Sequence, residues 1–149
     1  MIIAIGAASL NLGVAMACGA VIGSERQVRQ RMAGLRTNAL VALGAAGFVT
    51  FSQLFPHEVS QTRVAAQVVS GIGFLGAGII FRDGFNVHGL NTAATLWTSA
   101  AVGACAGADL LAEAVLGTLF ILAANTLLRP IVNNINRNGQ FESGGNALM

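Results

Sequence analysis

Long apolar stretches separated by short polar linkers dominate the pattern of this chain. A helix that crosses a membrane needs about 20 mostly apolar residues, with a range of roughly 17 to 25. Five stretches meet this requirement; four contain no charged residue, and the last holds only Glu113, near its start. The pattern therefore predicts transmembrane helices over residues 2–23, 38–55, 64–81, 90–108 and 110–128.

The linkers between these stretches are short, which leaves no room for a separate soluble domain. We expect residues 1–137 to form one transmembrane domain and residues 138–149 to form a polar flexible tail. A membrane β-barrel would instead show segments of about ten residues with alternating polarity. Because the apolar residues run continuously, the predicted fold class is an all-α membrane protein, a bundle of five transmembrane helices.

Arginines lie mostly on one side of the predicted bundle. The first and third linkers and the segment after the last helix hold seven of them, whereas the second linker holds only Arg63. Basic residues near helix ends remain on the cytoplasmic side of a membrane. The N-terminus is therefore predicted outside and the C-terminus in the cytoplasm. Each arginine near the surface also attracts anionic lipid by about 1 kcal/mol, so anionic lipids are expected at the cytoplasmic rim.

Composition excludes several classes of protein. Only 9% of the residues are charged and 54% are hydrophobic, whereas a soluble domain carries about 25% charge. So few charges cannot cover a water-facing surface, and so many apolar residues exclude disorder. A formal charge of +2 is too small to indicate a nucleic-acid surface. No nucleophile with a nearby base is evident, so neither enzymatic activity nor a cofactor is expected.

Glycines are frequent, with 19 in the chain. Residues 71–76 (GIGFLG) have the spacing of a dinucleotide-binding fingerprint, but that motif needs a preceding strand and an acidic residue about 20 residues later. Position 91 is Asn, and the motif lies inside an apolar stretch. Small residues in membrane helices let two backbones approach closely. We therefore expect close helix packing at Gly71, Gly73, Gly76 and Gly78, and at the pairs Gly19/Gly23 and Gly103/Gly107.

Polar side chains gather at the predicted cytoplasmic ends of the helices. In a low dielectric such groups need partners, so Glu25 or Asp83 should pair with arginines 26, 36 or 82. The pattern indicates either a network that ties the helices together or a binding site, and it does not separate the two. We hypothesise that Arg36, Asn91 and Thr92 form the functional part. The candidate residues are Glu25, Arg26, Arg36, Thr37, Asn38, Asp83, Asn91, Thr92 and Thr95.

The predicted outer side offers a few acidic residues. Asp109 and Glu113 are four residues apart, which would place them on one helix face, and His57 and Glu58 lie in another outer loop. Magnesium often uses only one or two carboxylates and keeps several waters. The spacing is compatible with weak Mg²⁺ association, although solvated acidic residues at the membrane interface are the more common explanation.

Three stretches carry a shared signature: RMAGLRTNALV at 31–41, AAQVVSGIGFLGAG at 65–78 and GLNTAATLW at 89–97. Together with GSERQ at 23–27, they resemble the MgtC/SapB family of bacterial inner-membrane proteins, in the family's order and spacing, from about Leu12 to Arg137. Arg36, Thr37, Asn91 and Thr92 match motif positions of the family.

This resemblance implies a multi-pass protein of the bacterial plasma membrane, linked to magnesium limitation and, in intracellular pathogens, to survival inside macrophages and virulence. It implies a regulator that restrains the proton-driven ATP synthase rather than a magnesium carrier. Longer members continue after the last helix into a cytoplasmic ACT-like domain, whereas here a tail rich in Asn and Gly follows Arg137. Either this member lacks the domain or the chain is shortened.

Two functions are compatible with these features. The first is a non-enzymatic regulator that binds membrane subunits of a complex such as the ATP synthase. The second is a transporter or channel for Mg²⁺ or another ion. A conduction path usually leaves ionisable groups at mid-membrane. Because no carboxylate lies there, a pore would need a homo-oligomer around Thr95, Thr98 and Ser99. We favour the regulator, and homo-oligomerisation is expected in either case.

Overall fold

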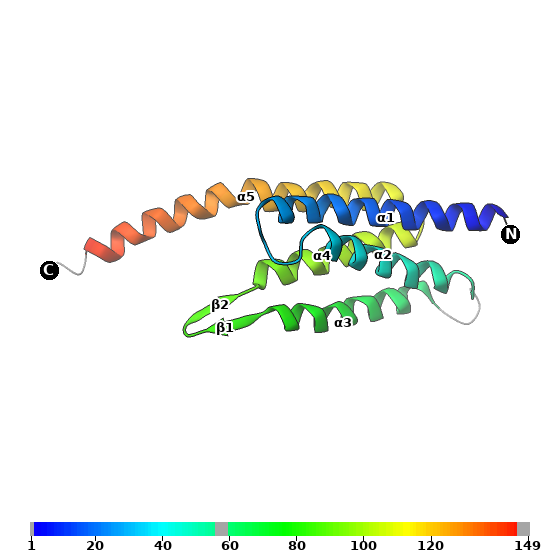
Figure 1. The fold of residues 1–149 in the computed structure, drawn as a ribbon, viewed down its shortest axis with the longest axis horizontal. Helices are drawn as coiled ribbons and strands as arrows, with labels where there is room; N and C mark the ends of the chain where they lie inside the picture. Colours follow the sequence, from blue (N-terminus) through cyan, green and yellow to red (C-terminus); the bar gives the residue numbers. More distant parts are fainter. Residues whose placement is uncertain (1, 56–59, 146–149) are drawn as a thin grey trace.

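The computed structural model of the chain describes residues 2–55 and 60–145. These residues form five helices and one β-hairpin (Figure 1). Four of the helices are long and apolar enough to cross a membrane, namely α1, α2, α3 and α5. The prediction of a mostly helical membrane protein is therefore confirmed, with four helices of membrane-spanning length among the described residues. The elements are α1 (Ile2–Val28), α2 (Leu35–Ser52), α3 (Gln61–Ile79), β1 (Phe81–Asp83), β2 (Asn86–His88), α4 (Leu90–Gly107) and α5 (Leu111–Gly145).

Helix α4 is the one described helix that is not apolar enough along its length to count as a membrane-spanning segment by itself, and it contacts the other four helices. It contributes Leu96 and Ala100 to an apolar cluster with α2 and α3, and Val102 and Ala106 to a second cluster with α1. Polar residues of α4 are buried as well. Because neighbouring helices cover one side of α4, that side tolerates serine, threonine and alanine, whereas Leu90 and Trp97 are exposed.

Small residues set the closest approach between helices. A Cβ atom on Gly107 of α4 would lie 2.5 Å from the carbonyl oxygen of Ala46 on α2. A Cβ atom on Gly103 would collide with the carbonyl oxygen of Ala42, one turn earlier on α2. Gly19 and Gly23 of α1 are equally tight against α2 and the residues that precede it. The predicted close packing at these two glycine pairs is confirmed.

The glycines of α3 behave differently. A Cβ atom on Gly71, Gly73 or Gly78 would have nothing within 4 Å, and one on Gly76 would have only the Ala93 Cβ atom, at 3.5 Å. Within one chain, therefore, the packing prediction holds only for Gly76, which is buried beside Ala93 of α4, and not for Gly71, Gly73 and Gly78, whose side of α3 no described helix covers. Contact with a second chain stays a prediction. The fingerprint at residues 71–76 lies inside α3, and among the described residues no strand precedes it as a dinucleotide-binding motif requires.

The hairpin was not predicted, and it corrects the all-α prediction. Strands β1 and β2 pair antiparallel, with Phe81 opposite His88 and Asp83 opposite Asn86. A two-residue loop joins them, and its first residue, Gly84, has a positive φ of 59°. Glycine at this position is typical of type II′ hairpin turns. The third helix was predicted to continue to residue 81, but α3 ends at Ile79 and Phe81 is the first residue of β1.

Helix α5 is longer than predicted. It continues from Leu111 to Gly145, past the predicted end at residue 128, with Pro130 inside it (Figure 1). Proline lacks an N–H group, so the carbonyl of Thr126 loses its helical donor. The apolar residues beyond Pro130 extend the helix, and part of the predicted tail, residues 138–145, has a helical backbone.

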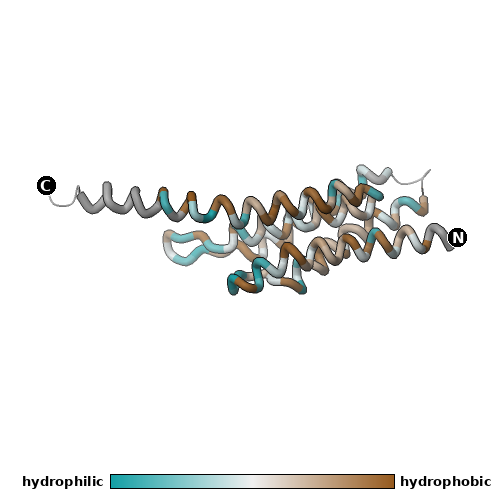
Figure 2. The backbone as a smooth tube through the Cα atoms, turned by 90° about the horizontal axis from the view of Figure 1, so that it is seen from above, coloured by the Kyte–Doolittle hydropathy of each residue, from teal (hydrophilic) through white to brown (hydrophobic). Residues whose placement is uncertain are grey.

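The antiparallel arrangement gives the bundle two distinct ends. The C-terminal end of α1, the N-terminal ends of α2 and α4, and the hairpin lie together at one end (Figure 1), which we call the hairpin end. The C-terminal end of α2, the N-terminal end of α3 and the turn from α4 to α5 lie at the opposite end (Figure 1). Figure 2 shows hydrophilic residues in the hairpin and hydrophobic residues along the helices.

Candidate functional site

A polar cavity lies at the hairpin end, between α1, α4 and α5. Its volume is about 460 Å³, and we call it the arginine cavity. Helices α1 and α4 and the linker after α1 supply its polar lining, while α5 adds polar and apolar residues. The lining residues are Glu25, Arg26, Arg29, Arg31, Asn91, Ala124, Asn125, Leu128, Arg129 and Val132.

Arg26 joins three parts of the chain at this cavity. Its side chain, on the last turns of α1, is only 2% exposed. Its Nη2 donates hydrogen bonds to Thr92 Oγ1 on α4 and, at 3.4 Å, to the Met32 carbonyl oxygen. The Arg31 backbone N–H donates to the Arg26 carbonyl oxygen at 3.0 Å. The linker therefore folds back over the end of α1, where Gln30 takes a positive φ of 52°.

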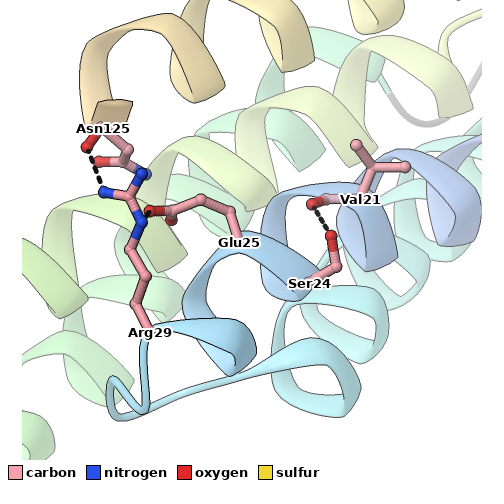
Figure 3. A network of polar contacts seen from close by, with 5 residues as sticks. All are labelled: Val21, Ser24, Glu25, Arg29 and Asn125. Atoms are coloured by element: carbon pink, nitrogen blue, oxygen red, sulfur yellow. Dashed lines mark hydrogen bonds and ion pairs between the residues drawn. The ribbon is translucent and has the colours of Figure 1, made fainter. Parts of the chain in front are cut away.

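Arg29 connects α1 to α5. Its Nε lies 2.9 Å from Glu25 Oε1, and its Nη1 donates to the Asn125 carbonyl oxygen at 3.3 Å (Figure 3). The Arg29 and Glu25 side chains are 26% and 14% exposed. Exposed ion pairs contribute about 0.2–1 kcal/mol, and this pair has the added role of orienting Arg29 toward α5.

Three buried polar atoms at the cavity have no hydrogen-bond partner among the described residues. They are Glu25 Oε2, Arg26 Nε and Asn125 Nδ2. Leaving a buried polar group without a partner costs about 1–3 kcal/mol. All three residues line the cavity. The site therefore retains two donors and one acceptor that a further partner can satisfy.

The structure brings four of the predicted site residues together here. Glu25, Arg26 and Asn91 line the cavity, and Thr92 holds Arg26. The sequence analysis missed Asn125 and Arg129 on α5. Their spacing of four residues places both on one helix face. An amide and an arginine on one face of an apolar helix were the signal that could have found them.

Two other predicted residues serve the packing of the bundle. Asn38 is fully buried at the start of α2, and its Nδ2 donates to the carbonyl oxygens of Ala33 and Gly34 at 2.7 and 3.0 Å. Its Oδ1 accepts a hydrogen bond from Ser99 Oγ of α4 at 2.8 Å. The hydroxyl of Thr95 donates to the Asn91 carbonyl oxygen at 2.8 Å, within α4. Neither residue lines the arginine cavity.

The remaining predicted residues at this end lie apart. Arg36 and Thr37 are exposed and line a separate, mostly apolar groove of about 940 Å³ between α2 and α3. Asp83 is exposed in the hairpin and makes no ion pair with any described residue. The predicted pairing of Glu25 or Asp83 with arginines 26, 36 or 82 is wrong, because the Glu25 carboxylate pairs with Arg29 instead.

At the opposite end, Asp109 has a packing role. It precedes α5, with a positive φ of 64°, so the prediction that it shares a helix face with Glu113 is wrong. Its Oδ1 accepts a hydrogen bond from Asn11 Nδ2 at 2.6 Å, and its Oδ2 accepts one from Gln53 Nε2 at 3.2 Å. These bonds connect α1 and α2 to the turn between α4 and α5.

His57 and Glu58 lie outside the described residues, so the structure does not place this part of the predicted outer acidic site. Among residues 2–55 and 60–145, no group of three His, Cys, Asp or Glu side chains is close enough to hold a metal ion.

Comparison with known proteins identifies the family. The profile of the MgtC family matches residues 12–134. The chain belongs to the MgtC family. The resemblance found in the sequence is thereby confirmed, and membership of this family together with four membrane-length helices indicates a multi-pass membrane protein.

The relatives include proteins named MgtC from two bacteria. The chain is 61% identical to protein MgtC of Brucella abortus (strain 2308) over 135 residues, which cover 88% of this chain and 57% of the relative. It is 59% identical to protein MgtC of Salmonella typhimurium (strain LT2) over 128 residues, covering 86% of this chain and 55% of the relative. The chain thus spans little more than half the length of these MgtC proteins. No solved structure matches it.

Proposed function

We propose that this MgtC-family protein is a non-enzymatic regulator in the bacterial inner membrane, where it serves adaptation to low magnesium and intracellular survival. It acts by binding and restraining another membrane complex, such as the ATP synthase. The resemblance to the MgtC/SapB family motivates this proposal, and the uncovered face of α3 is the structural observation that supports it.

Helix α3 is apolar enough to cross a membrane, yet only 6% of its membrane-length segment is buried by the rest of the chain. Phe74 and Leu75 are 82% and 50% exposed. The open positions at Gly71, Gly73 and Gly78 leave space for a second backbone. Small residues of this kind favour helix association in lipid, where apolar surface alone gives no driving force. A transmembrane helix of a partner complex fits this face.

The proposed orientation has the hairpin end in the cytoplasm. Arg63 lies at the start of α3, at the opposite end, while the arginines of the hairpin end outnumber it. Basic residues near helix ends stay on the cytoplasmic side. In this orientation the chain crosses the membrane five times, α4 included. The arginines of the hairpin end are Arg26, Arg29, Arg31, Arg36, Arg82 and Arg129.

The alternative, an oligomeric pore for Mg²⁺ or another ion, is less well supported, because two of its three predicted lining residues are buried within one chain. Thr95 and Ser99 are 4% and 0% exposed inside a single chain. Their hydroxyls donate to the Asn91 carbonyl oxygen and to Asn38 Oδ1. Residues buried in one protomer do not face a channel between protomers, so of the three predicted lining residues only the half-buried Thr98 is available to such a pore.

Site-specific photocrosslinking in native membranes tests the regulator proposal. A photoreactive phenylalanine analogue at Phe74 of α3 should crosslink to a membrane subunit of the ATP synthase. The matched control is Phe120 of α5, which is 73% exposed and lies on another helix. Synthase crosslinks from position 74 and not from position 120 are expected. Their absence from folded protein at position 74 would contradict docking on α3.

A flux measurement addresses the alternative. The purified protein, reconstituted in liposomes that contain a Mg²⁺-sensitive dye, should give no more Mg²⁺ entry than empty vesicles. Saturable entry that Asn91→Ala abolishes would overturn the regulator proposal and make the hairpin end part of an ion pathway.

A further inference from the structure

The arginine cavity carries more positive charge than its own side chains neutralise. Four arginines line it against one glutamate, which leaves a formal charge of +3. The Glu25 carboxylate is already paired with Arg29. Arg26, Arg31 and Arg129 have no carboxylate within ion-pair distance among the described residues. Like charges held together near a low-dielectric bundle repel one another, and a bound anion relieves that repulsion.

One of these arginines is almost completely removed from water. Arg26 is 2% exposed, and its Nε donates no hydrogen bond to any described residue. Because Thr92 and Met32 accept hydrogen bonds from Nη2, the guanidinium is held in a fixed orientation. A buried cation without an anionic partner is costly. Asn125 adds a second buried donor without a partner, its Nδ2.

The cavity also has the size and lining of a ligand site. Its volume of about 460 Å³ falls within the range of about 300–1,000 Å³ that is usual for small-molecule sites. Ala124, Leu128 and Val132 recur every four residues along α5 and form an apolar wall beside the arginines. An occupant with an anionic part and an apolar part matches both kinds of lining.

We propose that the arginine cavity binds a phosphate group. Arg26, Arg31 and Arg129 neutralise its charge, and the Asn125 amide donates a hydrogen bond to one of its oxygens. Guanidinium groups bind phosphate oxygens through paired, charge-assisted hydrogen bonds. The cavity lining has a formal charge of +3. A carboxylate would neutralise only one of these charges, whereas a phosphate group carries one to two negative charges. Glu25 Oε2 accepts a hydrogen bond from water or from a ligand hydroxyl.

This phosphate belongs either to the headgroup of an anionic phospholipid or to a soluble phosphate compound. The apolar wall on α5 suits the glycerol and acyl part of a lipid, whereas the arginines and asparagines of the lining alone suit a soluble ligand. The inference goes beyond the proposed function, because it concerns a ligand of the protein itself and holds whether or not a partner complex docks on α3.

Two binding measurements on the purified full chain separate the sources. In nanodiscs of phosphatidylcholine, inorganic phosphate is titrated and followed by calorimetry and by the unfolding temperature, with sodium chloride of equal ionic strength as the screening control. In a second set of nanodiscs, phosphatidylglycerol replaces part of the phosphatidylcholine, and native mass spectrometry counts the anionic lipid that stays bound.

A matched pair of variants locates the site. Arg31→Gln combined with Arg129→Gln lowers the lining charge while keeping the contacts of Arg26, and both side chains are exposed. We expect the affinity for phosphate, or the retention of phosphatidylglycerol, to fall about tenfold or more. Arg36→Gln is the control, because it removes an exposed arginine of the same end that lines the other groove. It should leave binding within about twofold.

Binding of inorganic phosphate supports a soluble source, and selective retention of phosphatidylglycerol supports a lipid source. The absence of both in protein that unfolds cooperatively would overturn the proposal. An equal loss in Arg36→Gln would overturn it as well, because the effect would then be general attraction by the arginine-rich end. If the double variant does not fold, each single substitution gives the same comparison.

Discussion

Helices α3 and α4 resemble each other in sequence and differ in their surroundings. Both are uncharged over their central turns, they are 19 and 18 residues long, and they contain four and two glycines, respectively. Helix α4 contacts every other helix, and Gly103 and Gly107 bring it against the backbone of α2. Among the described side chains of α3, only Ile72 and Gly76 are buried. The spacing of glycines thus shows where a second helix could pack closely, but it does not show whether a second helix is present there.

The polar residues of the two helices differ in the same way. Thr92, Thr95 and Ser99 of α4 point into the bundle and are buried, whereas Ser70 of α3 is exposed. A polar group inside a membrane bundle is tolerated when neighbouring helices satisfy it. Four substitutions test this contrast between a central and a peripheral helix.

Gly103→Ala should have the largest effect. The added methyl group would collide with the carbonyl oxygen of Ala42, and backbone cannot move aside as a side chain can. We expect the free energy of unfolding to fall by about 3 kcal/mol or more. Reversible unfolding in mixed micelles measures it. The control is Gly73→Ala on α3, and equal losses in both variants would contradict the packing of α4 on α2.

Leu96→Ala should come next. Leu96 is 1% exposed in the cluster that α4 shares with α2 and α3, and its truncation leaves a cavity that costs about 2–3 kcal/mol. The matched truncation is Phe74→Ala on α3, where the side chain is 82% exposed. Thermal unfolding in detergent compares the two. A larger loss from Phe74→Ala would mean that α3, and not α4, is the central helix.

Asn38→Ala should cost about 1–3 kcal/mol, because Ser99 on α4 loses its acceptor and two carbonyl groups lose their donor. Adding Ser99→Ala should recover part of this loss, since no buried hydroxyl is then left without a partner. A double-mutant cycle on the free energy of unfolding measures the coupling. Strict additivity would show that the Asn38–Ser99 hydrogen bond does not stabilise the fold.

Gly73→Leu should have the smallest effect on a single chain, less than about 0.5 kcal/mol, because nothing lies within 4 Å of the new Cβ atom. If a partner helix packs on α3, the same substitution should abolish crosslinking from position 74 in native membranes. For this variant, therefore, the stability measured by unfolding in detergent should hardly change, whereas the crosslink from position 74 should be lost. A large loss of stability in detergent would show that another segment of the chain covers α3.

The candidate site could be predicted only in part. Glu25, Arg26, Asn91 and Thr92 were found because polar side chains at the ends of apolar helices are conspicuous. Arg129 was missed because its helix was expected to end at residue 128, and Asn125 was missed because it lies within an apolar stretch, away from the helix ends where polar residues were sought. Asn38 and Asp109 were taken for functional groups, yet they satisfy neighbouring polar groups inside the bundle. The sequence could not separate these two roles, because the same polar side chains hydrogen-bond to ligands and to neighbouring helices.

The order of apolar and polar residues is enough to identify a multi-pass helical protein, and the sequence also locates the five helices and indicates the family. Each long apolar segment must satisfy its own backbone in lipid, so this information is local. The packing of the helices, in contrast, places α4 at the centre, leaves α3 open on one face, and brings Arg26 to Thr92, 66 residues away in the sequence. Helices that are apolar on all sides have no amphipathic stripe to indicate their neighbours, so their rotation is set by packing alone.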